Sequence, residues 1–215
     1  IEHGAPGGQM NNTSEIENYP GYDHISGPEL SMKMHAPLEK FGVENIYGIV
    51  KSIEDAGDVK RVITEDATYE AKTIILATGA KNRSLGVAGE EEYTSRGVSY
   101  CAVCDGAFFR NQDLLVVGGG DSAVEEAGYL TQFAKSVTII HRRDELRAQK
   151  ILQDRAFANE KINFIWDSVV KEIKGNDIKV SGVVVENVKT GEISEHEFGG
   201  IFIYVGVDPV SKMVE

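Results

Sequence analysis

A close pair of cysteines offers the clearest chemistry in this sequence: Cys101 and Cys104 are its only two, separated by an alanine and a valine. Zinc ligation, a pair of buried structural thiols and a redox-active dithiol are the competing uses. A structural zinc ion needs four ligands, usually a second pair at similar spacing, and the five histidines are scattered, so we expect no metal site. A redox-active dithiol fits best, because its disulfide closes and opens without moving the fold and C-x-x-C surroundings often lower the pKa of one thiol.

The residue after this pair, Asp105, is an acid. A carboxyl group at this position is placed to exchange a proton with a leaving thiolate, as a general acid or base does. The structural alternative is a turn, which is the commonest use of Asp followed by Gly. We predict the proton-transfer role and keep the turn as the alternative.

A glycine loop follows the apolar run Leu114–Val117, which predicts a buried strand. The loop has the pattern G-x-G-x-x-A, and a helical pattern continues from it. In such a loop, glycine permits the tight turn and the approach of a pyrophosphate, the final alanine permits close packing, and the helix N-terminus offers free N–H groups. A glycine-rich turn that binds nothing is the alternative. The loop residues predicted to contact a dinucleotide are Gly118, Gly120, Asp121, Ser122 and Ala123.

A basic group ends the next predicted strand, where His141, Arg142 and Arg143 are followed by Arg147. An NAD site would carry an acid here, about 20 residues after the glycines, to hold the ribose hydroxyls. Guanidinium groups suit a phosphate instead, because their planar fork donates hydrogen bonds in pairs and stays charged. We therefore predict NADPH with its 2′-phosphate on the three arginines; the alternative is pairing of an arginine with Asp144.

A dithiol beside an NADPH site implies a third component. Nicotinamide gives up a hydride, whereas a disulfide is opened by a thiolate or by electrons passed from a flavin. We therefore predict FAD as a second cofactor.

The elements that position these groups predict an α/β protein. Strand and helix patterns alternate as β-α-β-α-β from residue 113 to 165, one half of a doubly wound sheet, and hairpin-like strands follow to residue 207. Before them, an S-x-x-E capping box at Ser26 opens a helix that Pro37 should kink or end. Short strands are predicted at Ile46–Val50, Val59–Thr64 and Thr73–Ala77.

Composition excludes several classes of protein. The 215 residues include 22 Lys plus Arg and 34 Asp plus Glu, a formal net charge of −12, which argues against a nucleic-acid partner. The longest apolar runs are strand-sized, so we expect no membrane span, and 41% apolar residues are ordinary for a soluble globular protein. Nothing at the start of the sequence resembles a signal peptide, and we expect a cytoplasmic protein.

Taken together, the motifs resemble the bacterial-type, low-molecular-weight thioredoxin reductases of the pyridine nucleotide–disulfide oxidoreductases. The matching runs are Gly7–Met10, Glu17–Gly21, Ile75–Ala80, Gly97–Ser99, Cys101–Gly106, Gly118–Ala127 and His141–Ala148. The resemblance implies a homodimeric flavoenzyme that passes electrons from NADPH through FAD and a Cys101–Cys104 disulfide to thioredoxin. It also implies that Cys101 attacks thioredoxin, that Cys104 lies nearer the flavin, and that Asp105 protonates the outgoing thiolate.

The resemblance further implies a Rossmann-like, three-layer NADPH domain inserted into an FAD domain. We expect a partial FAD domain at 1–83, the NADPH and dithiol domain at 84–207, and the returning FAD segment at 208–215, with hinges at Ala80–Ser84 and Val207–Pro209. Positions that match FAD-contacting segments are Gly7, Gly8, Gln9, Asn18, Thr78 and Gly79; Arg96 and Phe108 fall where the family contacts thioredoxin. The family's opening glycine loop for FAD and its closing Gly-Asp motif are not found, so we expect a middle piece of a larger protein that binds FAD weakly or not at all.

Two other functions stay open. One is a non-catalytic NADPH-binding fragment. The other is the flavoprotein reductase of a peroxiredoxin system, which shares this core but usually has proline after the first cysteine, where this chain has Ala102.

Overall fold

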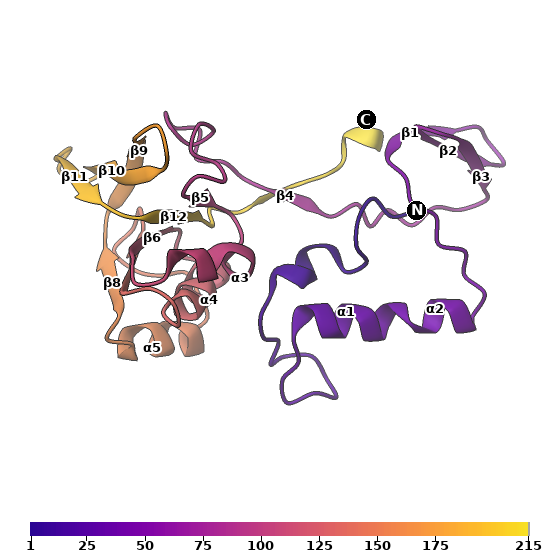
Figure 1. Ribbon diagram of the computed structural model, residues 1–215. Coiled ribbons are helices and arrows are strands. Elements are labelled where there is room, and N and C mark those ends of the chain that lie inside the picture. Colours follow the sequence, from indigo (N-terminus) through magenta and orange to yellow (C-terminus); the bar gives the residue numbers. More distant parts are fainter. Residues whose placement is uncertain (215) are drawn as a thin grey trace. The chain divides into compact units, whose positions relative to one another are not determined.

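The computed structural model describes residues 1–214, which divide into two compact units. Unit 1 comprises Ile1–Lys81 with the C-terminal residues from Asp208 onward, and unit 2 comprises Asn82–Val207. The chain crosses between the units twice. The strands at the two crossings, β4 (Ala80–Asn82) and β13 (Val207–Pro209), pair in a two-stranded sheet (Figure 1).

A five-stranded parallel sheet forms the centre of unit 2, in the order β5-β12-β6-β7-β8. Its strands are β5 (Val98–Ser99), β6 (Asp113–Val117), β7 (Ser136–Ile140), β8 (Ile162–Ile165) and β12 (Gly200–Ile203). Helices α4 (Asp121–Leu130) and α5 (Lys150–Ala158) connect β6 to β7 and β7 to β8. The predicted β-α-β-α-β order is therefore confirmed.

The two faces of this sheet bury two separate apolar clusters, because side chains alternate along each strand. Leu114 and Val116 of β6 face α4 and α5, where Ala127 and Leu130 pack on them. On the opposite face of the parallel sheet, Leu115 and the other buried residues of the second cluster pack on an antiparallel sheet. That sheet has the order β11-β10-β9 and comprises β9 (Ser168–Gly175), β10 (Val180–Asn187) and β11 (Ile193–Glu197). Figure 1 shows the resulting layers of helices, parallel sheet and antiparallel sheet, the predicted three-layer α/β fold.

Two short helical turns complete unit 2 between β5 and β6. They are α3 (Ala102–Asp105) and the 3-10 helix η2 (Gly106–Phe109). Both lie on the helical face: Ala102 belongs to the same cluster as Leu114, and the Phe109 ring meets Phe202 of β12 edge to face, at 5.3 Å between centroids.

Unit 1 combines helical turns with a small antiparallel sheet in the order β1-β2-β3. Its remaining elements are η1 (Gly8–Asn12), α1 (Gly27–His35), α2 (Pro37–Lys40), β1 (Val50–Asp55), β2 (Lys60–Thr64), β3 (Thr68–Ala71) and η3 (Lys212–Val214). The predicted helix is confirmed at both ends. Ser26 caps it by accepting a hydrogen bond from the Glu29 amide at 3.3 Å, and α1 ends at His35 before Pro37 opens α2.

Two of the strand predictions for unit 1 are wrong. The run Ile46–Val50 is irregular, and the strand starts only at Val50, where pairing with β2 begins. The run Thr73–Ala77 forms no strand, and Ile75 is 93% exposed. A continuous apolar run becomes a strand only where a neighbouring strand accepts its backbone hydrogen bonds, and none of the described residues pairs with Thr73–Ala77.

Among residues 1–214, no helix combines the length and the apolar character that crossing a membrane requires.

Candidate redox and nucleotide-binding site

The two cysteines form a disulfide at the start of α3, with their Cα atoms 5.4 Å apart. Cys101 is the N-cap of this short helix, and its Sγ accepts a hydrogen bond from the Cys104 amide at 3.2 Å. An amide aimed at a sulfur stabilises the thiolate over the thiol. Cys104 is exposed and Cys101 half-buried within the described residues. Cys101 is therefore the cysteine whose sulfur accepts a backbone hydrogen bond from within the turn.

Asp105 is held in place beside this disulfide. The Ser99 hydroxyl donates to Asp105 Oδ2 at 2.6 Å, and Ser99 Oγ also accepts a hydrogen bond from the Cys101 amide at 3.0 Å. Ser99 lies at the end of β5, so one serine joins the acid to the cysteine. The sequence did not single out Ser99, although its position two residues before the dithiol is the available signal. Asp105 also lies in the last position of α3, so both the turn and the proton-transfer interpretations are compatible with the geometry.

Tyr204 reaches the dithiol from the far end of the sequence. Its hydroxyl accepts a hydrogen bond from the Ala102 amide at 2.8 Å, and Ala102 is fully buried. Burial, and the nearby charge of Glu126, raise the pKa of the Tyr204 hydroxyl, so it stays protonated. Burial also raises the pKa of Glu126 to about 8, with a smaller contribution from Glu125. The surroundings of the dithiol turn therefore contain a tyrosine and a carboxylic acid that are both neutral at pH 7.

A cavity of about 690 Å³ lies at the carboxyl ends of β6, β7 and β12. Strand order reverses here: β7 lies on one side of β6, and β12 lies on the other. Open α/β sheets bind ligands at such a switch point. Of the residues predicted to bind the nucleotide, eight line the cavity: Gly118, Gly120, Asp121, Ser122, Ala123, His141, Arg142 and Arg147. Arg143 belongs to the same loop but is not among the lining residues.

The glycines of the loop differ in what surrounds them. Gly118 has a φ of 147°, and a Cβ there would lie 2.4 Å from the Tyr204 carbonyl oxygen and 2.9 Å from Ala123. A side chain at Gly120 would meet nothing within 4 Å. The first glycine is therefore required by the turn and by packing, whereas the open space at Gly120 leaves the backbone free to approach a ligand.

His141 lines the cavity, as predicted, but most of its ring is buried. Its ring is buried beneath Gly119, where a Cβ would lie 2.5 Å from Nδ1. Burial lowers the pKa of His141, and the charges of Arg143, Arg142 and Arg147 lower it further. Nε2 forms no hydrogen bond within the described part of the chain. His141 is therefore a neutral ring under the loop, and Gly119, which the sequence analysis did not select, is the glycine that this ring requires.

The basic loop is fastened to the glycine loop by its backbone and by Asp121. The amides of Arg147 and Ala148 both donate to the Gly119 carbonyl, at 2.6 and 3.2 Å. Asp121, the first residue of α4, accepts hydrogen bonds from the Gln149 amide and side chain at 2.7 and 3.2 Å. Asp121 thus acts as a clamp between the two loops, while Ser122 is exposed in the first turn of α4.

The three arginines are exposed, and none of their guanidinium groups forms an ion pair or hydrogen bond with the described residues. The alternative of an Arg–Asp144 pair is wrong: Asp144 pairs with Lys189, Oδ2 to Nζ, at 2.8 Å. Lys189 lies 45 residues further along the chain, on the turn between β10 and β11. The unpaired guanidinium groups of Arg142 and Arg147, which line the cavity, can bind an anion such as phosphate.

Several lining residues were missed by the sequence analysis because they follow other strands. Ser168 and Val169 open β9, shortly after the carboxyl end of β8. The segment 204–207 follows β12, and the segment 82–85 leads into the unit from β4. The available signal was the parallel topology, which brings all carboxyl ends to one edge.

The residues predicted to contact FAD lie in unit 1. Gly7 and Gly8 have φ values of 111° and 51°, which suit glycine. The Gln9 side chain donates to the Ala80 carbonyl at 3.1 Å. Thr78 Oγ1 donates to the Val210 carbonyl at 2.6 Å, and Val210 N donates to the Gly79 carbonyl at 3.0 Å. Asn18 is exposed and forms no hydrogen bond with residues 1–214.

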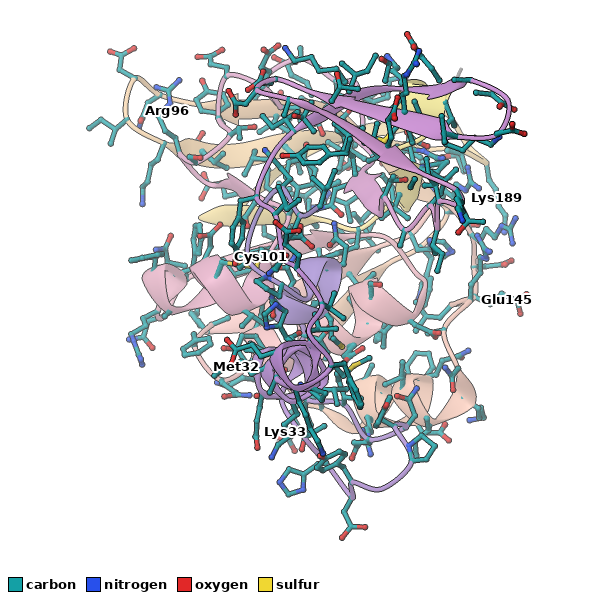
Figure 2. All side chains as sticks on the ribbon, turned by 90° about the vertical axis from the view of Figure 1, so that its right-hand side faces the viewer. Met32, Lys33, Arg96, Cys101, Glu145 and Lys189 are labelled. Atoms are coloured by element: carbon teal, nitrogen blue, oxygen red, sulfur yellow. A yellow bond between two sulfur atoms is a disulfide. The ribbon has the colours of Figure 1, made fainter. Side chains whose placement is uncertain are left out.

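The two residues predicted to contact a partner protein are placed differently. The Arg96 guanidinium donates to the carbonyls of Glu92 and Asp177 and lies over the Tyr93 ring, so a local structural role accounts for it. The Phe108 side chain is 79% exposed. Figure 2 labels Arg96 and Lys189 on opposite sides of the molecule in that view.

Within residues 1–214, no three His, Cys, Asp or Glu side chains cluster as metal ligands would.

Comparisons with known proteins bear on this site. The family described as pyridine nucleotide-disulphide oxidoreductase matches residues 1–215. Thioredoxin reductase of Listeria monocytogenes is 58% identical over 212 residues, covering 99% of this chain and 66% of that protein. Thioredoxin reductase of Bacillus subtilis is 55% identical over 215 residues, covering 100% of this chain and 68% of that protein. The chain thus spans about two thirds of the length of these curated relatives.

A solved structure is also similar over nearly the whole chain. The crystal structure of Lactococcus lactis thioredoxin reductase, in the conformation termed FR, matches with a TM-score of 0.98 at 70% sequence identity. The match covers 99% of this chain and 70% of the Lactococcus chain.

Proposed function

Because the chain belongs to the pyridine nucleotide-disulphide oxidoreductase family, as its motifs predict, we propose that it carries the nucleotide and dithiol machinery of a flavin-dependent thioredoxin-disulfide reductase. The observation that carries this proposal is the placement of both sites on unit 2. The Cys101–Cys104 disulfide and the glycine-loop cavity belong to one compact unit, and Tyr204 takes part in both.

NADPH is the nucleotide that this cavity fits. The free space at Gly120 suits the pyrophosphate, and Arg142, Arg143 and Arg147 have no carboxylate partner to displace. The 2′-phosphate would lie on these guanidinium groups, since charge-assisted hydrogen bonds to phosphate are strong and directional. A chain with net charge −12 would otherwise repel this ligand.

FAD is the second proposed cofactor, and unit 1 contributes residues that fit it in part. Gly7 and Gly8 have left-handed backbone where a side chain would be strained, and the end of the Thr78–Gly79 segment is held by Val210. FAD, when bound, supplies the conversion of a hydride from NADPH into a pair of electrons for a disulfide. We expect this chain to bind FAD weakly or not at all, and we assign the remaining contacts to these residues.

The chain's own residues then perform thiol–disulfide exchange. Two electrons and two protons convert the Cys101–Cys104 disulfide into two thiols. The Cys101 thiol passes its proton to Asp105, and the resulting thiolate attacks one sulfur of the thioredoxin disulfide; the other sulfur leaves as a thiolate and takes that proton from Asp105. The Cys104 thiol then attacks Cys101 in the mixed disulfide, which re-forms the intrachain disulfide, and its proton goes to the second thioredoxin sulfur as that sulfur leaves. Thioredoxin as the partner and a homodimeric assembly are carried over from the resemblance and stay predictions.

The exchange step can be tested without either cofactor. The chain is reduced with dithiothreitol, freed of reagent, and mixed anaerobically with oxidised thioredoxin; thiols on thioredoxin are counted by alkylation and mass spectrometry. We expect one thioredoxin disulfide to be reduced per chain. Cys104→Ser should accumulate a mixed disulfide through Cys101, whereas Cys101→Ser should not. A reduced wild-type chain that leaves thioredoxin oxidised would contradict the proposal.

The complete reaction is tested by NADPH-dependent reduction of thioredoxin with and without added FAD. Turnover that requires both FAD and NADPH supports the full electron route. Turnover that proceeds without FAD would overturn the flavin step and leave the exchange step intact.

A further inference from the structure

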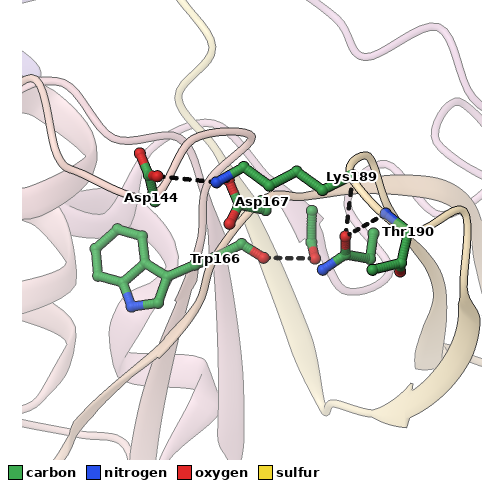
Figure 3. Close-up of polar contacts among 7 residues, drawn as sticks. Asp144, Trp166, Asp167, Lys189 and Thr190 are labelled. Carbon is green, nitrogen blue, oxygen red and sulfur yellow. Dashed lines mark hydrogen bonds and ion pairs between the residues drawn. The ribbon is translucent and has the colours of Figure 1, made fainter.

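Lys189 makes a contact that neither the fold nor the proposed chemistry requires. Its Nζ lies 2.8 Å from Asp144 Oδ2 and 3.0 Å from Asp167 Oδ1, so one ammonium group bridges two carboxylates (Figure 3). Asp167 has a side chain only 17% exposed, and its φ is 51°. Asp144 is exposed and immediately follows Arg143. The lysine therefore ties the arginine loop to the start of β9.

The turn that carries Lys189 is held by hydrogen bonds that do not involve the lysine side chain. Asn187 Oδ1 accepts hydrogen bonds from the amides of Lys189 and Thr190, both at 3.0 Å, as Figure 3 shows. The Val188 amide donates to the Asp167 carbonyl at 2.6 Å. The backbone of the turn is thus fixed against the segment that it contacts, so the side chain loses little further freedom on pairing.

The same corner holds the backbone of the arginine loop. The Asp167 amide donates to the Arg143 carbonyl at 3.1 Å, and the Ser168 amide donates to the His141 carbonyl at 3.0 Å. One side of the loop is therefore fastened to the glycine loop through Arg147, and the other side is fastened to the corner at Asp167.

The charge balance of the loop depends on this lysine. Asp144 is the acid nearest in sequence to Arg142 and Arg143, and a carboxylate can pair with a guanidinium group through charge-assisted hydrogen bonds. In this structure the carboxylate pairs with Lys189, and the guanidinium groups have no partner among the described residues. The lysine also lowers the pKa of Asp144, so the pair stays ionised on both sides.

We propose that Lys189 is a specificity-determining positioning residue: by engaging Asp144 and Asp167, it keeps the neighbouring guanidinium groups available for the 2′-phosphate of the nucleotide. Without the lysine, Asp144 would pair with an arginine or repel the phosphate directly. Either event weakens binding of a 2′-phosphorylated ligand and leaves a ligand without that phosphate unaffected. The inference rests on the proposed NADPH site.

The test measures dissociation constants by calorimetry for 2′,5′-ADP and for 5′-AMP, which lacks the 2′-phosphate, using the full chain at low salt. For Lys189→Met we expect the dissociation constant of 2′,5′-ADP to rise about threefold to tenfold, since exposed charges interact weakly and are screened. The constant for 5′-AMP should stay within about twofold. Lys189→Arg keeps the charge and should retain the wild-type preference.

Two further variants separate this mechanism from a general loss of charge. Lys171→Met removes a lysine of similar exposure from β9 of the antiparallel sheet, where it pairs with Glu186 at 2.9 Å, and should leave the preference unchanged. Adding Asp144→Asn to Lys189→Met should restore it, because the competing carboxylate is then absent.

The outcomes distinguish the inference from the function on which it rests. A wild-type chain that binds both ligands equally overturns the NADPH assignment and this inference with it. A wild-type preference that Lys189→Met fully retains overturns only the role of Lys189. Failure of Asp144→Asn to restore binding in a folded double variant overturns the competition mechanism.

Discussion

Unit 2 buries both faces of its sheet, whereas unit 1 leaves many large apolar side chains exposed. Phe202, Leu114 and Leu115 of unit 2 are fully buried. In unit 1, the exposed fractions are 74% for Phe41 and 73% for Met32, which is labelled in Figure 2. Burial of apolar surface is the dominant stabilising term in folding, so the two units should differ in how strongly they resist change. The dithiol and the cavity both lie on the tightly packed unit, where small displacements of their side chains are resisted most.

The same substitution in the two units should give the largest contrast. Phe202→Ala empties a site in a close-packed core and should lower the free energy of unfolding of unit 2 by about 3–5 kcal/mol. Phe41→Ala removes an exposed ring and should change stability by less than about 0.5 kcal/mol. Urea unfolding followed by fluorescence of Trp166, the single tryptophan, reports on unit 2. Equal effects of the two substitutions would show that unit 2 is not packed as described.

A second contrast lies in the response to pH. The pKa of Glu126 rises from 4.5 in the unfolded chain to about 8 in the folded protein, chiefly through burial. Between these values the folded state holds a proton that the unfolded chain has lost, so stability falls as pH rises through this window. Glu126→Gln removes the titration and should be more stable than the wild type above pH 8 by about 2–4 kcal/mol.

Urea midpoints from pH 5 to pH 9 measure this difference. Glu145→Gln is the matched control, because Glu145 is exposed and forms no hydrogen bond or ion pair with the described residues. If the urea midpoints of the wild type and Glu126→Gln changed with pH in the same way, that result would contradict the burial of a neutral carboxyl group.

The smallest expected effect concerns the helix of unit 1. Ser26→Ala removes the hydrogen bond to the Glu29 amide and should destabilise α1 by about 1 kcal/mol. Hydrogen exchange, read on peptides by mass spectrometry, should show faster exchange in Gly27–His35. Peptides from β6 and β7 should exchange as in the wild type. Faster exchange throughout unit 2 would break the distinction between the units.

How far the sequence could predict the fold depends on where the partners of each segment lie. Leu114–Val117 and Thr73–Ala77 are both short apolar runs, and both were predicted as strands. The first became β6 because β12 and β7 flank it, with Ile201 opposite Leu115. The second has no pairing strand among the described residues, and Ile75 is 93% exposed. A local apolar pattern indicates that a segment can be buried, but the segment becomes a strand only where a neighbouring strand pairs with it.

The site was predictable where its residues are close in sequence and was not where they are distant. The C-x-x-C pair and the glycine loop are local patterns with fixed geometry, so their spacing was sufficient. Whether Asp144 pairs with an arginine or with Lys189 depends on a turn 45 residues away. The hydroxyl that accepts a hydrogen bond from the Ala102 amide comes from Tyr204, 102 residues away. Nothing in the spacing of these residues reports that the sheet brings them together.

Tyr204 belongs to two sites at once, and this limits how the chain can vary. Its carbonyl oxygen lies where a side chain at Gly118 would project, while its hydroxyl accepts the amide next to Cys101. Every residue at position 204 would supply the carbonyl oxygen, but only tyrosine supplies this hydroxyl. Tyr204 also lines the cavity, so a replacement there that improved nucleotide binding would remove the hydroxyl that accepts the Ala102 amide. Such sharing makes adaptation of either site conditional on the other, so we expect laboratory evolution of nucleotide preference to proceed through the arginine loop and Lys189 and to leave Tyr204 unchanged.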